Sequence, residues 1–444
     1  MKYDSIRKLN DIHNYIMQMR PILDRNALFS DGTADYRIPQ EPEPNEAVTI
    51  RFRTAANNVD QVFLCCEDQK LEMRLTERER KFDYYEVTVQ LGDQPFFYWF
   101  EVVSGMLHCF FDRIGVAKEP RAQYKFEIVP GFRVPQWAKG AVMYQIFTDR
   151  FCNGDPANDV ENGEYYYIDR LTKKVDNWDK NPADFDVADF YGGDLAGVIS
   201  KMDYLQELGV EVLYFNPLFV SASSHKYDTQ DYDYVDPHFG VILEDCEDVL
   251  REGETDNRKA GKFRTRVTSR KNLEASNELF VRLVEEAHKR GMRVILDGVF
   301  NHCGSFNKWL DCEKIYDGNE AFPVGAFLKK DSPYHDYFRF QSDKDFPDNR
   351  SYEGWWGHET LPKLNYEGSK ELEEYILSVA AKWVSPPYCA DGWRLDVAAD
   401  LGHTPEYNHA FWRKFRKVVK EANPQALILA EHYGDPKALS LIHI

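Results

Sequence analysis

The sequence predicts two domains: an all-β domain, then a parallel α/β domain. Residues 47–130 contain short runs of alternating apolar and polar residues, separated by charged or Gly-containing turns, which is typical of a β-sandwich. From residue 141 onward, apolar strand candidates alternate with amphipathic helix candidates, which indicates a parallel sheet covered by helices. The length of 444 residues also exceeds that of most single domains.

The first domain is predicted over residues 31–132, after a polar and partly helical lead-in at residues 1–30. In its clearest strand candidates every second residue is apolar. These candidates are Val48–Arg53, Tyr85–Val89 and Phe97–Val102. Pro130, Gly131 and Pro135 then mark a linker to the second domain.

The second domain is predicted over residues 133–444 as an incomplete (β/α)8 TIM barrel, of which about five of eight units are legible. No Gly-x-Gly-x-x-Gly fingerprint is present, so the pattern favours a barrel over a dinucleotide-binding fold. The strand candidates are Ala141–Phe147, Val210–Pro217, Arg293–Phe300, Gly392–Ala398 and Leu427–His432. The helix candidates are Leu195–Leu208, Asn277–Arg290, Lys370–Val384 and Tyr407–Ala422.

Two longer segments interrupt this alternation. Residues 243–275 are first acidic and then basic, and we expect a solvated surface insertion there. Residues 303–366 follow the third strand candidate and are rich in aromatic side chains. A segment of this length and composition predicts a small inserted subdomain over the mouth of the barrel.

Composition and charge exclude several classes of partner. The net charge of −19 argues against nucleic acid and against an anionic membrane, since both would be repelled. The chain has no run of 18 apolar residues, and its first residues lack the apolar core of a signal peptide. Its eight cysteines have no Cys-x-x-Cys spacing, so we expect reduced thiols in a cytoplasmic protein.

Charged residues gather at the predicted carboxyl ends of the strands, where barrel enzymes place their chemistry. Arg394 and Asp396 share one face of the fourth strand candidate. Asp297 and His302 belong to the end of the third strand, and Glu431 belongs to the fifth. Taken alone, Arg394 and Asp396 are explained as an ion pair that stabilises the core, and Glu431 as a surface residue at the end of a strand.

Together these residues fit the cleavage of a glycosidic bond, which needs one ionised carboxylate and one protonated carboxyl group. Arg394 is expected to keep Asp396 ionised by charge pairing. Desolvation beside Ala430 is expected to raise the pKa of Glu431.

The chain resembles the α-amylase family of glycoside hydrolases. Asp297–His302, Gly392–Asp396 and Glu431 match the first three signature regions of that family in order. Leu361-Pro-Lys-Leu-Asn365 matches the motif of its neopullulanase, cyclomaltodextrinase and maltogenic amylase group, and His225–Asp228 with Gly240 resembles the second-strand loop of that group. The similarity runs from about Phe29 to Pro436 and includes a sandwich of the starch-binding type.

The resemblance implies a retaining hydrolase in which Asp396 is the nucleophile and Glu431 is the general acid and base. It implies cleavage of α-1,4, and as a further option α-1,6, glucosidic bonds in cyclodextrins, pullulan or maltooligosaccharides. The implied supporting residues orient the nucleophile, bind sugar hydroxyls, stack on the sugar or line the leaving-group side: Arg394, Asp297, His302, His225, Tyr227, His432 and Trp356. A glucanotransferase and a noncatalytic glucan-binding protein remain alternatives.

An oxygen-rich stretch, Asn153–Asp159, offers ligands suited to a hard cation. By itself the stretch is typical of a polar turn. The resemblance implies a calcium site made by Asn153, Asp155, Asn158, Asp159, the Gly192 carbonyl and Asp194.

The chain departs from the family after Pro436, where the fourth signature region and its third catalytic Asp are expected but not found. We therefore expect a truncated gene product that is weakly active or inactive by itself. The resemblance also favours a homodimer formed through the N-terminal domain.

Overall fold

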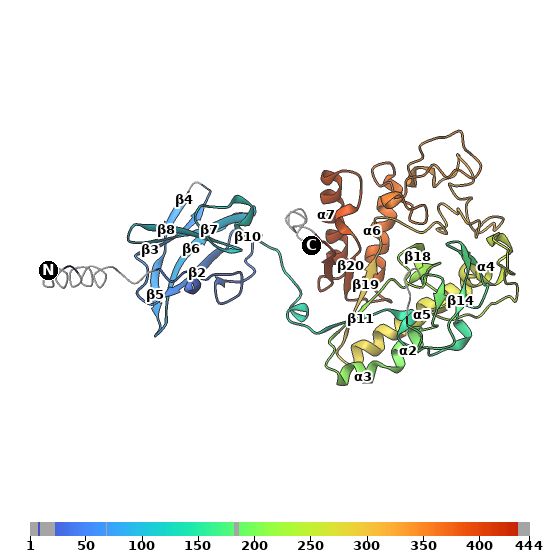
Figure 1. Cartoon of the computed structure of the whole chain (residues 1–444), viewed down its shortest axis with the longest axis horizontal. Coiled ribbons are helices and arrows are strands. Elements are labelled where there is room, and N and C mark those ends of the chain that lie inside the picture. The colour runs from blue at the N-terminus through green and yellow to red at the C-terminus, as the bar shows by residue number, and fades with distance from the viewer. Residues whose placement is uncertain (1–7, 9–22, 68, 182–185, 434–444) are drawn as a thin grey trace. The chain divides into compact units, whose positions relative to one another are not determined.

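The structure is a computed structural model that describes residues 8, 23–67, 69–181 and 186–433. The chain divides into two compact units, residues 1–133 and residues 134–444, which are treated separately below (Figure 1). The first unit is all-β and the second is α/β, so the predicted fold class is confirmed.

The first unit is a sandwich of two antiparallel sheets. One sheet has the order β1 (Arg37–Ile38), β2 (Ala47–Ala55), β6 (Phe82–Gln90), β5 (Arg74–Arg78). The other has the order β4 (Gln69–Glu72), β3 (Gln61–Cys66), β7 (Phe96–Ser104), β8 (Leu107–Asp112), β9 (Gly115–Ala117), with β10 (Phe126–Ile128) paired to β7. Alternate residues of β2 are buried, and Phe52 lies 4.5 Å from Phe100 of the facing sheet, between ring centroids.

The second unit is built on a parallel sheet whose strands follow one another in chain order. These strands are β11 (Met143–Ile146), β16 (Val212–Phe215), β19 (Arg293–Gly298), β20 (Gly392–Leu395) and β21 (Leu427–Ala430). All five strand predictions are confirmed, although each strand is shorter than its apolar run. Sequential parallel order is that of a barrel wall, and among the described residues β11 and β21 are the edges of the sheet.

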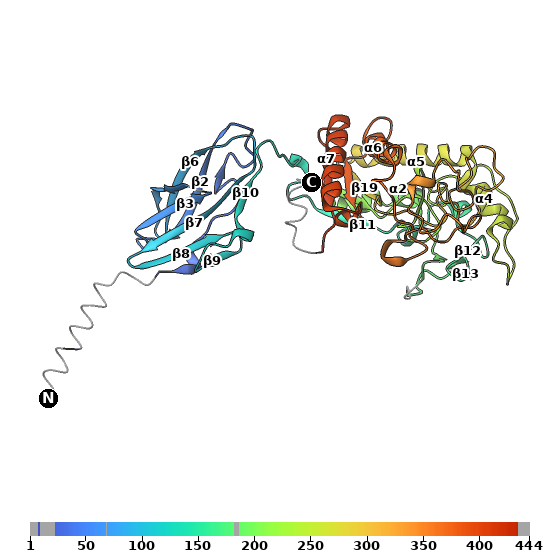
Figure 2. The ribbon, with the colours of Figure 1, turned by 90° about the horizontal axis from the view of Figure 1, so that it is seen from above.

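Helices follow the strands and cover the sheet. They are α2 (Leu195–Ser200), α3 (Met202–Glu207), α5 (Arg270–Lys289), α6 (Lys370–Val384) and α7 (Pro405–Ala422). The bounds of α6 agree with the prediction, and Ser369 caps its first turn by accepting the Leu372 N–H. The predicted helix at residues 195–208 is instead two helices, because Lys201 leaves helical geometry with φ −101° and ψ 3°. In Figure 2, α5 and α6 lie along one side of this unit.

The prediction of a solvated insertion at residues 243–275 is wrong for the part around α4 (Gly261–Thr268), whereas residues such as 247, 248 and 251–253 are exposed as expected. The segment also contains η6 (Asn257–Lys259) and the first turns of α5. Phe263 is fully buried, and Arg266 is only 1% exposed. Arg266 Nη1 lies 3.0 Å from Glu164, and its Nη2 lies 2.8 Å from Asp245. Arg266 is therefore a buried residue paired with the buried Glu164 and the more exposed Asp245, not part of a solvated face.

The aromatic segment at residues 303–366 has little regular structure beyond η7 (His335–Tyr337) and η8 (Trp355–Gly357). Trp309 and Tyr337 belong to the same apolar core as Trp393 of β20, so the segment packs onto the sheet-and-helix core. The remaining short strands pair as β12 (Tyr166–Tyr167) with β13 (Arg170–Leu171), β14 (Lys173–Lys174) with β15 (Asp189–Phe190), and β17 (Phe219–Ser221) with β18 (Thr229–Val235).

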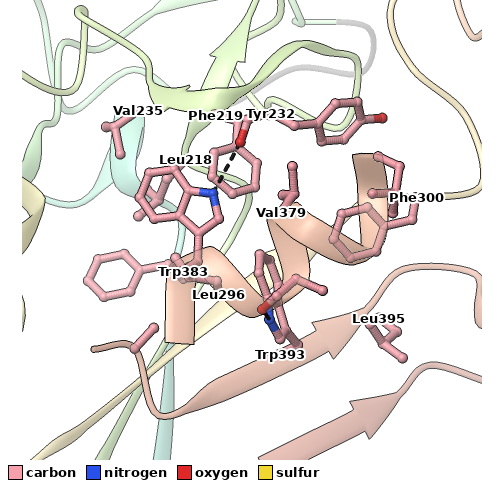
Figure 3. Close-up of a cluster of buried hydrophobic side chains, with 14 of the residues drawn as sticks. Leu218, Phe219, Tyr232, Val235, Leu296, Phe300, Val379, Trp383, Trp393 and Leu395 are labelled. Atoms are coloured by element: carbon pink, nitrogen blue, oxygen red, sulfur yellow. Dashed lines mark hydrogen bonds between the residues drawn. The ribbon is translucent and has the colours of Figure 1, made fainter. Parts of the chain in front are cut away.

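Two buried tryptophans fix α6 over the sheet (Figure 3). Trp383 of α6 donates its indole N–H to the Tyr232 carbonyl at 3.1 Å. Trp393 of β20 donates to the Ala380 carbonyl at 3.0 Å. Because strand side chains alternate, burying Trp393 and Leu395 on this face turns Arg394 to the other one.

In the part of the chain that the structure describes, no helix has both the length and the apolar content needed to cross a membrane. All eight cysteines lie in this part and are free.

Candidate active site

Three carboxyl groups from neighbouring strand ends converge on the guanidinium group of Arg394. The register of β19 and β20 places Arg394 beside Asp297, and Arg394 Nη1 lies 3.0 Å from both Asp297 carboxylate oxygens. Nη1 also lies 2.8 Å from Asp396 Oδ1, and Nη2 lies 2.8 Å from Glu431 Oε1. The structure therefore brings together four residues that the sequence singled out.

Asp297 is held from its other side by two tyrosine hydroxyls. Tyr214 of β16 donates to Asp297 Oδ2 at 2.6 Å, and Tyr227 donates to the same oxygen at 2.9 Å. Burial raises the pKa of Asp297 to about 6, against the charge of Arg394. The sequence analysis missed Tyr214, although its hydroxyl is an unusual group within the apolar run Val210–Pro217.

The protonation order of the other two carboxyls is the reverse of the expected one. Burial, and then repulsion by Asp297, raise the pKa of Asp396 to about 7 although Arg394 opposes them. Burial of Glu431 also favours its neutral form, but the Tyr433 hydroxyl, the Val397 N–H and Arg394 outweigh it, so the pKa of Glu431 is lowered. In the ligand-free protein the two pKa values are therefore shifted in the opposite directions from those expected: burial raises that of Asp396, and hydrogen bonds together with the Arg394 charge lower that of Glu431.

Backbone strain lies directly after Asp396. Val397 has φ 38° and ψ 46°, a left-handed conformation that is unfavourable for a β-branched residue. Its N–H donates to Glu431 Oε2 at 2.9 Å. The strained turn therefore ends the strand at the site and joins the two carboxyl-bearing segments.

The Arg394 cluster opens into a cavity of about 730 Å³. Seven of its lining residues were predicted in addition to Arg394: His225, Tyr227, His302, Trp356, Asp396, Glu431 and His432. The sequence analysis did not assign the others to the site: Trp355, Leu361, Val397, Ala399, Asp400 and Tyr433. Asp297 lies beneath the cavity and does not line it.

Two of the three histidines that line the cavity, His302 and His225, already have protein partners. His302 Nε2 lies 3.1 Å from the Tyr227 carbonyl, and its Nδ1 lies 3.2 Å from Asn301 Nδ2. His225 Nδ1 accepts the Tyr227 N–H at 3.0 Å and lies 3.1 Å from the Ser223 hydroxyl. Burial lowers the pKa of His302 to about 4 and also lowers the pKa of His225, so both rings are neutral.

One wall of the cavity is aromatic. Trp355 stacks on His302 with ring centroids 4.9 Å apart and planes 9° apart. Trp356 stacks on Trp355 at 4.8 Å and is 79% exposed. Flat rings of this kind suit the apolar face of a sugar. Trp355 could have been found from its place next to Trp356 in the sequence.

The predicted calcium residues lie together around the start of α2. Asp194 caps this helix and accepts the N–H groups of Gly197 at 2.6 Å and Asp155 at 2.7 Å. Asn153 Nδ2 donates to Asp159 Oδ1 at 2.7 Å. A Cβ on Gly192 would lie 2.3 Å from that oxygen, so this backbone approaches the cluster closely.

This cluster has oxygens to offer a cation. The buried Oδ1 atoms of Asn153 and Asn158 accept no hydrogen bond from any residue that the structure describes. Lys174 lies 2.8 Å from Asp159 Oδ2 and competes with a cation there. No three His, Cys, Asp or Glu side chains gather into a metal site within the described ranges, so amide and carbonyl oxygens would have to contribute. With that contribution, the residues fit a calcium ion.

Replacing Asp396 should stabilise the protein at alkaline pH. The pKa of about 7 in the folded state exceeds the usual unfolded value near 4, so the folded state loses stability from this group as pH rises from about 4 through 7. Asp396→Asn should therefore raise the free energy of unfolding by about 1–3 kcal/mol at pH 8 and give little gain at pH 4. Urea unfolding at both pH values measures this.

The exposed Asp179→Asn serves as the matched control and should change stability by no more than about 0.5 kcal/mol at either pH. An equal effect of Asp396→Asn at both pH values would contradict the assigned electrostatics.

Comparison with known proteins agrees with this arrangement. The profile described as "Alpha amylase, catalytic domain" matches residues 145–258 and 275–441, and "Alpha amylase, N-terminal ig-like domain" matches residues 42–130. A cyclomaltodextrinase of Thermoanaerobacter pseudethanolicus is 31% identical over 443 residues, which cover 93% of this chain and 62% of that protein. Neopullulanase 2 of Thermoactinomyces vulgaris is 34% identical over 372 residues, which cover 80% of this chain and 51% of the relative.

Among solved structures, the type III pullulan hydrolase from Thermococcus kodakarensis matches with a TM-score of 0.56 and 26% identity, over 91% of this chain and 61% of that one. The chain thus spans between 51% and 62% of the length of these three proteins. Two family profiles in their expected order, together with the matching fold, show that this chain belongs to the alpha-amylase family.

Proposed function

We propose that this chain carries the catalytic groups of a retaining glycoside hydrolase for α-1,4 glucosidic bonds, with α-1,6 bonds as a further option, in cyclodextrins, pullulan or maltooligosaccharides. One observation carries the proposal: Asp396 and Glu431 both lie 2.8 Å from the same guanidinium group, at the base of a cavity with an aromatic wall. Two carboxyl groups on one cation cannot be far apart, as a retaining mechanism requires. The family and the names of the relatives support the substrate class.

In the first step, an Asp396 oxygen attacks the anomeric carbon as the bond to the leaving sugar oxygen breaks. Glu431 donates its proton to that oxygen. In the second step, water attacks the anomeric carbon, Glu431 takes the water proton, and the bond to Asp396 breaks. Arg394 stabilises the Asp396 carboxylate, and Asp297 with its two tyrosine partners holds Arg394 in place.

Catalysis therefore needs the opposite protonation order from that of the ligand-free site. Asp396 must lose its proton, and Glu431 must gain one. Glu431 can become the acid once a bound sugar separates it from Arg394 and from the Tyr433 hydroxyl, since these contacts lower its pKa. Substrate binding thus sets the protonation state that the reaction requires.

The proposed sugar contacts come from the cavity wall. Tyr227 stacks on the sugar being cleaved, while His302 and His225 bind its hydroxyls. Trp356 and His432 line the leaving-group side. Because both histidines are neutral and already bonded to protein groups, the sugar has to share or replace those hydrogen bonds.

Variants of the two carboxyls should respond differently to the leaving group. In a longer form of the protein that is active, Asp396→Asn should lower kcat about 1,000-fold or more on both a maltooligosaccharide and a maltosyl fluoride, because both need the nucleophile. Glu431→Gln should lower kcat by a similar factor on the oligosaccharide. With the fluoride, whose leaving group needs no proton, Glu431→Gln should still form the glycosyl-enzyme. Peptide mass spectrometry would find the sugar on Asp396.

Glu406→Gln, an exposed carboxyl at the start of α7, is the control and should keep its activity. A normal rate of oligosaccharide cleavage by Asp396→Asn would refute the proposal. Product chromatography separates hydrolysis from transfer to a second sugar, since both pass through the same intermediate. Glucan binding without any turnover, in this chain and in a longer form, would favour a noncatalytic binding protein.

We expect the 444-residue chain by itself to be weakly active or inactive. It spans only 62% or less of the length of the relatives compared, and within the described residues its sheet is open at β11 and β21. The same fluoride assay measures this, and turnover of about 10 per second or faster would contradict it.

We further propose that Asn153, Asp155, Asn158, Asp159, the Gly192 carbonyl and Asp194 hold calcium. The orphaned oxygens of Asn153 and Asn158 support this assignment. Calcium added after chelation should release heat in titration calorimetry and raise Tm, while Asn153→Ala with Asn158→Ala should remove both effects. No heat and no shift in Tm would exclude the site.

The proposal also includes a homodimer formed through the N-terminal sandwich, and light scattering would measure the mass of that dimer. It further includes a cytoplasmic location. Eight free cysteines support a reducing compartment. The net charge of −19 supports the absence of nucleic acid and membrane partners.

A further inference from the structure

Lys363 lies behind the cavity wall and does not line it. Its segment runs antiparallel beside His302, with a bridge between the two residues. The Lys363 ammonium group donates to Asn301 Oδ1 at 3.0 Å and to the Asp400 carbonyl oxygen at 2.7 Å. This one cation therefore joins the end of β19, the segment after β20 and the inserted segment.

The first contact determines how His302 is protonated. An ammonium group only donates hydrogen bonds, so the Asn301 oxygen must face Lys363 and its amide nitrogen must face His302 Nδ1. An amide nitrogen also only donates, so Nδ1 accepts. The ring proton is then on Nε2, where it is donated to the Tyr227 carbonyl at 3.1 Å. Lys363 thus favours one neutral tautomer of His302.

The second contact determines where the tryptophans lie. The Asp400 carbonyl is bound by Lys363, and its side-chain Oδ2 accepts the Trp355 indole N–H at 2.9 Å. Trp355 in turn stacks on His302, and Trp356 stacks on Trp355. The contacts therefore form a closed ring from Lys363 through Asn301, His302, Trp355 and Asp400 back to Lys363.

We propose that Lys363 is a positioning residue for the glucan site, fixing the tautomer of His302 and the place of the Trp355–Trp356 stack. This inference rests on the proposed function for the identity of the ligand. Without the ammonium group, the Asn301 amide loses the charged partner that orients it within this ring of contacts. The Asn301 side-chain oxygen and the Asp400 carbonyl oxygen also lose the donor that they share. The histidine and the tryptophans then lose their common support.

The first test uses the ligand-free chain. Nitrogen-15 spectra of labelled histidine report the tautomer, with the His302 signal assigned from a His302→Gln variant. The wild type and Lys363→Arg should show the Nε2-protonated form from pH 6 to 8, and Lys363→Met should show a mixture. Lys330→Met is the matched control, because Lys330 lies in the same inserted segment and pairs with Asp343 at the surface. It should leave the His302 spectrum unchanged.

The second test measures binding of β-cyclodextrin and maltotriose by calorimetry in an Asp396→Asn background, which removes any dependence on turnover. Lys363→Met should weaken binding about tenfold, and Lys330→Met should not change it. Trp355→Phe keeps a stacked ring but loses the bond to Asp400, so it should weaken binding about threefold while leaving the His302 tautomer intact.

A folded Lys363→Met variant with the wild-type tautomer and wild-type affinity would overturn the inference. Should Lys363→Met fail to fold, unchanged affinity in Trp355→Phe would overturn it instead. If neither glucan binds even with Lys363 in place, the proposed function fails, whereas the tautomer comparison still decides the role of Lys363.

Discussion

The single positive charge of Arg394, surrounded by three carboxyl groups, is the constraint on which the rest of the site depends. One cation does not balance three closely spaced carboxylates, and together with burial this raises the pKa values of Asp297 and Asp396. The fold tolerates such a cluster because Trp393 and Leu395 bury the opposite face of the same strand. The hydroxyls of Tyr214 and Tyr227 donate hydrogen bonds to Asp297 without adding charge, so this carboxylate is bound on two sides without a second cation.

Most of the second unit could be predicted from the sequence because its strands are continuous apolar runs, a pattern that solvent exposure would not allow. The helix α4 could not be predicted in this way. Its arginine and lysine residues look solvated until their partners are known, and Glu164, the partner of Arg266, lies 102 residues away in the chain. Local charge patterning carries no information about such distant pairs.

The positions of Asp297, Arg394, Asp396 and Glu431 were predictable because parallel strands bring their carboxyl ends to one edge. The order in which they lose their protons was not predictable, since it depends on how the hydrogen bonds of the Arg394 guanidinium group are shared among the carboxyl groups in the folded structure. The contact between Trp355 and His302 was not predictable for a related reason. The two rings stack in the fold, although the residues are far apart in the sequence.

Helix α4 also decides how one buried carboxylate is neutralised. The helix lies between the two stretches that match the catalytic-domain profile, residues 145–258 and 275–441. Glu164 is fully buried and is shared between Arg266 of this helix and His238, at 3.0 and 2.7 Å. Removing the helix would take away one of these two charged partners and leave the desolvated carboxylate poorly neutralised. The helix and Glu164 should therefore be transplanted between homologues together.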